Sequence, residues 1–127
     1  MIDRIEFGEV RDGKLLIDSS VGADSTPDFH LYGDDTETEF SVDRNIIHYE
    51  NLYAGNDYVY ALYSGKRMDE TEERHSSLIE IYSWDGTPVE LLDLETPIAY
   101  IAVDENSRTV YGINPDMSDE MILVYRF

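Results

Sequence analysis

The chain has 127 residues and a mass of 14.6 kDa, and its 28 Asp and Glu against 9 Lys and Arg give a formal net charge of −19. This charge repels phosphate backbones and anionic membranes, so we expect no nucleic-acid partner. The absence of cysteine excludes disulfides, thiolate metal sites and cysteine nucleophiles, and a hydrophobic fraction of 42% predicts one globular domain over residues 1–127 rather than a disordered acidic chain.

Short segments that alternate apolar and polar residues recur along the chain, and this period of two predicts strands. They group into three repeats, at about residues 1–44, 45–95 and 96–127. The strands expected in the first repeat are Ile2–Phe7, Lys14–Ser20, Phe29–Tyr32 and Thr36–Val42. Those of the second repeat are Ile47–Tyr53, Tyr58–Tyr63, Leu78–Trp84 and Val89–Leu94. Those of the third repeat are Ile98–Val103, Thr109–Ile113 and Met121–Phe127.

Features at matching places support this division into repeats. The first hairpin of each repeat turns on Asp, Asn or Gly, which tolerate the positive φ of tight hairpin turns. Tyr60 matches Tyr111, and Tyr82 matches Tyr125, as packing between similar layers requires. The fold expected is all-β, with three antiparallel four-stranded propeller blades of which the last has three strands. Three blades do not close a ring, so the two outer blade faces would be exposed to water unless another part of a protein packs against them.

Three segments carry a resemblance to a known family: Tyr58–Lys66, Ile81–Val89, and Ile101–Glu105 followed by Thr109–Tyr111. They resemble the C-terminal half of the TolB-like six-bladed β-propeller proteins that are abundant in gut Bacteroides and relatives. The resemblance implies half of a six-bladed β-propeller, from a family whose members are mostly exported or attached to the cell envelope and mostly of unassigned function.

A full member of that family carries about three further blades and an N-terminal export signal with a lipidated cysteine, which this sequence does not contain. Either the chain is a fragment or half-length version, or two copies pair as a homodimer that completes the six-bladed ring. No signal-peptide pattern opens the sequence and no stretch approaches the ~18 apolar residues of a membrane span. We expect no membrane span and leave the compartment open.

Ligands of propellers usually bind where loops of successive blades converge near the axis. We expect four residues near that face to contact a ligand: Arg44, Tyr63, Lys66 and Arg67. Lys66 and Arg67 are an adjacent basic pair that suits an anionic group. The alternative for this pair is local salt bridges with the acids between Asp69 and Glu73.

No pattern in the sequence marks a catalytic, metal or cofactor site. His30, His48 and His75 lack metal-ligand spacing, and the acidic clusters lack the alternating acids and glycine of a calcium loop. No Gly-x-Ser-x-Gly nucleophile turn or glycine-rich phosphate loop is present. We therefore expect neither metal nor cofactor, and a non-enzymatic binding or scaffolding module for a protein or carbohydrate ligand.

Two alternatives remain open at this point. The first is a glycan lyase or hydrolase that uses carboxylates with Tyr63 or His48 near the propeller axis. The second is a truncated fragment without an independent role, which would expose apolar blade faces and aggregate.

Overall fold

The computed structural model describes residues 3–23, 30–33, 38–41, 45–70, 75–119 and 121–127, and within 30–33 and 38–41 it describes the backbone alone. In this part of the chain eleven strands form four antiparallel sheets, and no segment is helical. The same residues accordingly include no helix that is long and apolar enough to cross a membrane. The expected all-β class is confirmed.

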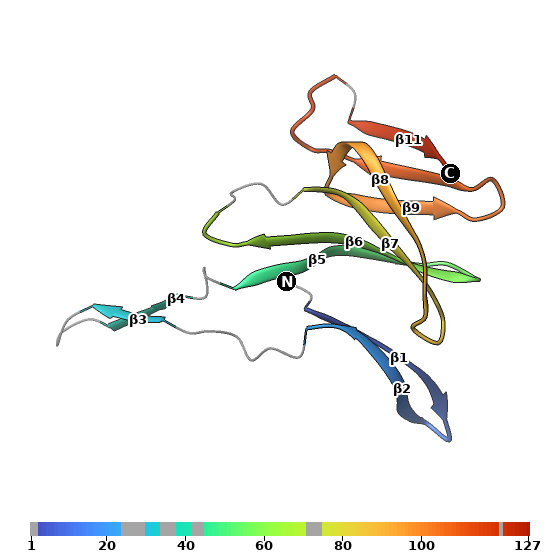
Figure 1. Cartoon of the computed structure of the whole chain (residues 1–127), viewed down its shortest axis with the longest axis horizontal. Coiled ribbons are helices and arrows are strands. Elements are labelled where there is room, and N and C mark those ends of the chain that lie inside the picture. Colours follow the sequence, from blue (N-terminus) through green and yellow to red (C-terminus); the bar gives the residue numbers. More distant parts are fainter. Residues whose placement is uncertain (1–2, 24–29, 34–37, 42–44, 71–74, 120) are drawn as a thin grey trace.

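The strands follow the chain in hairpins (Figure 1). The N-terminal hairpin is formed by β1 (Arg4–Arg11) and β2 (Lys14–Gly22), and a second hairpin by β3 (His30–Gly33) and β4 (Thr38–Ser41). The central sheet has the order β5 (Ile46–Ala54), β6 (Tyr58–Arg67), β7 (Ser76–Ser83) and β8 (Pro88–Ile98). The C-terminal sheet has the order β9 (Tyr100–Asp104), β10 (Thr109–Ile113) and β11 (Ile122–Arg126).

Turn residues define the hairpins as the sequence suggests. Asp12 and Gly13, at φ 51° and 75°, connect β1 to β2 in the left-handed conformation that matches the twist of a two-residue hairpin. Gly86, at φ 84°, also has a left-handed conformation, within the four-residue connection between β7 and β8. Because only glycine and short polar residues adopt this conformation at low cost, these positions fix the register of the flanking strands.

The central sheet is buried on both faces because its strands alternate two sets of apolar side chains. One face packs against the C-terminal sheet, and the shared core includes Tyr60, Leu62, Ile79, Ile81, Ile101, Val103 and Val110. The other face packs against the N-terminal hairpin, and this second core consists of Ile5, Phe7, Tyr49, Val59, Ala61 and Tyr82. The three layers therefore stack face to face, as neighbouring propeller blades do (Figure 1).

The first repeat differs from the four-stranded blade expected there. Its strands pair two by two, β1 with β2 and β3 with β4, in separate sheets. On the N-terminal hairpin Ile5 and Phe7 are buried under the central sheet, whereas Val10 and Leu15 are exposed.

Candidate functional site

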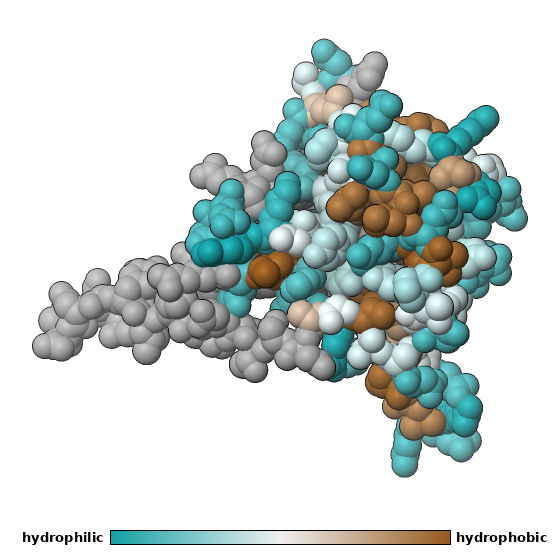
Figure 2. Space-filling view, in the orientation of Figure 1, coloured by the Kyte–Doolittle hydropathy of each residue, from teal (hydrophilic) through white to brown (hydrophobic). Residues whose placement is uncertain are grey.

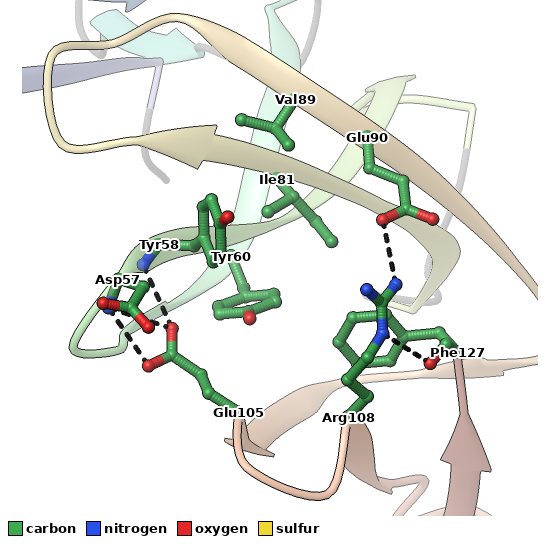
Figure 3. A pocket seen from close by; sticks show the side chains of 9 residues that line it. All are labelled: Asp57, Tyr58, Tyr60, Ile81, Val89, Glu90, Glu105, Arg108 and Phe127. Carbon is green, nitrogen blue, oxygen red and sulfur yellow. Dashed lines mark hydrogen bonds and ion pairs between the residues drawn. The ribbon is translucent and has the colours of Figure 1, made fainter.

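A pocket of about 200 Å³ lies between the central and C-terminal sheets, at the end where their first hairpins turn. Figure 3 shows its lining, which combines three aromatic rings, two aliphatic side chains, three carboxylates and one guanidinium. The lining residues are Asp57, Tyr58, Tyr60, Ile81, Val89, Glu90, Glu105, Arg108 and Phe127. The pocket is therefore built by two successive repeats, with charged groups at the rim of an aromatic wall.

Glu105 holds the β5–β6 turn from the neighbouring sheet. From the β9–β10 turn, its carboxylate accepts hydrogen bonds from the backbone N–H groups of Asp57 at 3.1 Å and Tyr58 at 3.0 Å (Figure 3). It also accepts one from the backbone N–H of Asn56 at 2.7 Å. Partial burial acts to raise the pKa of Glu105, but the backbone N–H groups outweigh it and leave the pKa below its ordinary value. The carboxylate is thus held ionised as an anchor between two blades.

Arg108 is fixed on the opposite side of the pocket. Its Nε donates to the carbonyl oxygen of Phe127 at 2.7 Å, and its Nη2 lies 3.3 Å from Oε2 of Glu90. The guanidinium stacks over the Phe127 ring at 4.8 Å from its centroid. Arg108 has φ 49°, an unfavourable conformation for a residue with a Cβ, and these contacts oppose that cost.

Tyr60 forms the back wall of the pocket. It is buried, and its ring meets Phe127 edge-on at 6.2 Å between centroids. Burial, followed by the negative charge of Glu105, raises the pKa of Tyr60 to about 12. The hydroxyl therefore stays protonated at neutral pH and is no candidate for a base there.

Three of the four charged groups of this pocket have structural partners. Glu105 is bound to the β5–β6 turn, and Glu90 and Arg108 are bound to each other across the two sheets. Among the residues that the structure describes, no three His, Asp or Glu side chains gather in a way that would hold a metal ion. The arrangement is suited to fastening blades together and leaves an aromatic wall for contact.

The residues predicted to contact a ligand lie at the other end of the sheets, with the exception of Arg44, which falls outside the described residues. Tyr63 is half-buried in β6 and meets Tyr49 edge-on at 5.8 Å. Lys66 donates from Nζ to the carbonyl oxygen of His75 at 3.4 Å. Arg67 forms salt bridges with Asp69 at 2.5 Å and with Glu70 at 3.7 Å, the local acids named as its alternative partners. A ligand role for these residues stays a prediction.

Sequence reasoning missed Glu105 and Arg108 as the residues that join the blades. Both lie in the β9–β10 turn, and their partners Asn56 and Glu90 belong to the preceding repeat. The only local signal was a polar turn at the start of the third repeat, which looks like any hairpin turn. The contact emerges when two repeats stack and bring their first turns together.

A second candidate surface is the outer face of the C-terminal sheet, named here the C-terminal face. Cross-strand register places nine side chains on it: Tyr100, Ala102 and Asp104 of β9, Thr109, Tyr111 and Ile113 of β10, and Ile122, Val124 and Arg126 of β11. Six of them are exposed and uncharged, namely Tyr100, Ala102, Tyr111, Ile113, Ile122 and Val124. Asp104 and Arg126 are the charged ones, and they lie at the end of the face next to the β9–β10 turn. Figure 2 shows hydrophobic residues, in brown, over the C-terminal strands and on the N-terminal hairpin. Contiguous apolar surface of this kind marks an interaction site on a folded protein.

Comparison with known proteins adds one match. A family model described as "TolB-like 6-blade propeller-like" matches residues 6–106, which span β1 through the β9–β10 turn. No curated protein and no solved structure matched the chain.

Proposed function

Because this chain belongs to the TolB-like 6-blade propeller-like family, we propose that it is a non-enzymatic binding or scaffolding module, half of a β-propeller ring that a second copy completes. The all-β architecture and the face-to-face stacking of its layers support the propeller part of this function. A module of this kind acts through the surfaces that its blades present, and it needs no reacting side chain.

The C-terminal face is the observation that carries the proposal. Its aromatic and branched side chains are exposed, with 56% of Tyr100, 64% of Ile122 and 59% of Val124 accessible to solvent. Exposing this much apolar surface is costly in water, at roughly 25 cal/mol for each Å². A partner that covers the face recovers this free energy, so the face favours association.

The pocket between the sheets supports the non-enzymatic part. A carboxyl group that acts as general acid or base exchanges its proton with a substrate. Of the three carboxylates of the pocket, Glu105 accepts three backbone hydrogen bonds and Glu90 pairs with Arg108, so these two hold the sheets together instead. The alternative of a glycan lyase or hydrolase draws no support from this pocket.

Turnover assays test the proposal. The purified chain is incubated with a panel of neutral and acidic polysaccharides, and product is followed as new reducing ends and as the ultraviolet absorbance of unsaturated uronates. We expect no turnover. Cleavage that disappears in Glu90→Gln but persists in Glu95→Gln, an exposed carboxylate on the same strand β8, would show that the protein is an enzyme.

A further inference from the structure

The contact between the central and C-terminal sheets defines which residues two blades of this protein bring together. The central sheet contributes Tyr60, Leu62, Ile79 and Ile81, each no more than 3% exposed. In the strand register Tyr60 lies opposite Ile81, and Leu62 lies opposite Ile79. The C-terminal sheet contributes Val103 and Val110, which lie opposite each other in β9 and β10.

The C-terminal face repeats the first half of this contact in the same register. Tyr111 lies opposite Val124, and Ile113 lies opposite Ile122. Counted from the start of the second strand of each sheet, Tyr111 and Ile113 occupy the places of Tyr60 and Leu62. Yet Tyr111 and Ile113 are 41% and 38% exposed, whereas Tyr60 and Leu62 are 2% and 0% exposed. The C-terminal face is a blade face that lacks its neighbouring blade.

The N-terminal hairpin repeats the second half of the contact. Val10 lies opposite Leu15, and this is the second pair counted from the β1–β2 turn. Val103 and Val110 are likewise the second pair counted from the β9–β10 turn. The next pair on the same side is Gly8 with Ile17, which corresponds to Ile101 with Gly112. Val10, Leu15 and Ile17 are 72%, 65% and 46% exposed. We name the side formed by Gly8, Val10, Leu15 and Ile17 the N-terminal face.

This face points away from the contact that the hairpin already makes. Successive residues of a strand point to opposite sides of the sheet. Phe7 is buried under the central sheet, so Gly8 and Val10 on the same strand face the other way, and a register shift lies between Phe7 and Gly8. Glu9 and its partner Leu16, on the side of Phe7, are exposed as well, so the turn end of the hairpin is uncovered on both sides.

The two ends of the chain therefore carry the two complementary halves of one blade contact, and both halves are exposed. We infer that the C-terminal face of each copy receives the N-terminal face of a second copy, so that two chains close a ring through two identical contacts. This inference rests on the proposed scaffolding function and names the partner of its uncovered face. Three layers in each copy give six in the ring, the number of blades in the family.

Area and charge agree with this pairing. The exposed side chains of the two faces bury on the order of 800 Å² at each contact, and two contacts reach the roughly 1,600 Å² of a stable protein–protein interface. The ten residues that form the proposed contact are uncharged, and the charged residues of the C-terminal face, Asp104 and Arg126, lie at its end next to the β9–β10 turn. A ring of two copies leaves no face exposed, whereas a filament leaves one at each end, and the ring closes when the contact relates the two copies by a half turn.

Cysteine cross-linking tests the pairing directly because the chain contains no cysteine of its own. Leu15→Cys and Val124→Cys place one thiol on each face, at positions where the exposed side chains tolerate substitution. The two variants are unfolded, mixed, refolded together and treated with a short bis-maleimide. We expect a covalent dimer in the mixture and none in either variant alone, since the two Leu15 side chains belong to different contacts.

Two controls make the result specific. Glu95→Cys, exposed on the outermost strand β8, replaces Leu15→Cys in a matched mixture and should give no dimer. The double variant L15C/V124C should stop at the covalent dimer, whereas a ladder of longer products would contradict a closed ring. Absence of cross-linking between Leu15→Cys and Val124→Cys, or equal cross-linking in a single variant, would overturn the pairing. These outcomes concern the contact alone and leave the turnover assays to decide the proposed function.

A substitution provides an independent measurement. Val124→Lys introduces a charge into the proposed contact and should weaken self-association at least ~30-fold, as a buried charge without a partner does. Leu91→Lys makes the same kind of change at an exposed leucine on β8, outside both faces, and should leave association unchanged. Equal association constants for Val124→Lys and the unaltered chain would contradict the inference.

Discussion

The anchoring role of Glu105 makes a quantitative prediction for Glu105→Gln. The carboxylate accepts backbone hydrogen bonds from Asn56, Asp57 and Tyr58, and bonds to a charged acceptor are roughly twice as strong as those to a neutral one. An amide keeps the shape of the side chain, but it loses the charge and presents an NH₂ group to donors. Allowing for partial solvent exposure, we expect a loss of about 1–2 kcal/mol in the free energy of unfolding.

Urea unfolding at one fixed chain concentration measures this loss. Trp84 is the only tryptophan, and its Nε1 donates to the carbonyl oxygen of Asn56, within the turn that Glu105 holds. The fluorescence of Trp84 should therefore report both the separation of Trp84 from the β5–β6 turn and global unfolding. With a urea dependence of about 2 kcal/mol per M, the midpoint should fall by roughly 0.5–1 M. Glu95→Gln is the matched control and should leave the midpoint in place.

The pH dependence of this difference follows from the lowered pKa of Glu105, whose ordinary value is 4.5. A depressed pKa in the folded state means that the carboxylate stabilises the fold above pH 4.5, and that this contribution is lost as pH falls through the folded-state pKa. The gap between the unaltered chain and Glu105→Gln should therefore be larger at pH 7 than at pH 3. A midpoint unchanged at pH 7, or a gap that does not narrow as pH falls from 7 to 3, would refute the reasoning.

Two further substitutions probe the core between the sheets. Gly112→Ala places a Cβ 2.7 Å from the Cδ1 and Cγ2 atoms of the buried Ile98. This substitution should therefore lower the free energy of unfolding by about 1–3 kcal/mol in the same urea assay. The double variant with Ile98→Val should recover part of this loss, because valine has no Cδ1. Burial raises the pKa of Tyr60 from 10.0 to about 12, so the neutral phenol stabilises the fold below pH 10 and this contribution declines between pH 10 and 12. Tyr60→Phe should lack that part of the alkaline decline, and identical profiles for the two proteins in denaturant titrations at pH 9 to 12 would contradict it.

Sequence pattern predicted the strands well because turn chemistry is local. The Asp12-Gly13 pair fixes its hairpin whatever surrounds it, since few other residues adopt positive φ cheaply. Pairing beyond a hairpin depends on contacts between segments that are distant in the sequence, and in the first repeat β2 and β3 lie in separate sheets. The local alternation of apolar and polar residues does not specify which hairpins pair with each other.

The tyrosines illustrate the same limit. Tyr60 and Tyr111 occupy matching places in their repeats, and both were predicted to pack between layers. Tyr60 is buried under the C-terminal sheet, whereas Tyr111 is 41% exposed because no layer lies over it in a single copy. The joining residues Glu105 and Arg108 escaped prediction for a related reason, since their partners are supplied by another repeat. Contacts between repeats need the stacking geometry, which one sequence does not provide.

The solution mass of the purified chain, measured by light scattering during gel filtration at several concentrations, tests the central claim most directly. A ring closed by two copies predicts a single species at twice 14.6 kDa that persists on dilution to low micromolar concentration. A species at 14.6 kDa across the same range would contradict the claim that a second copy covers the C-terminal face.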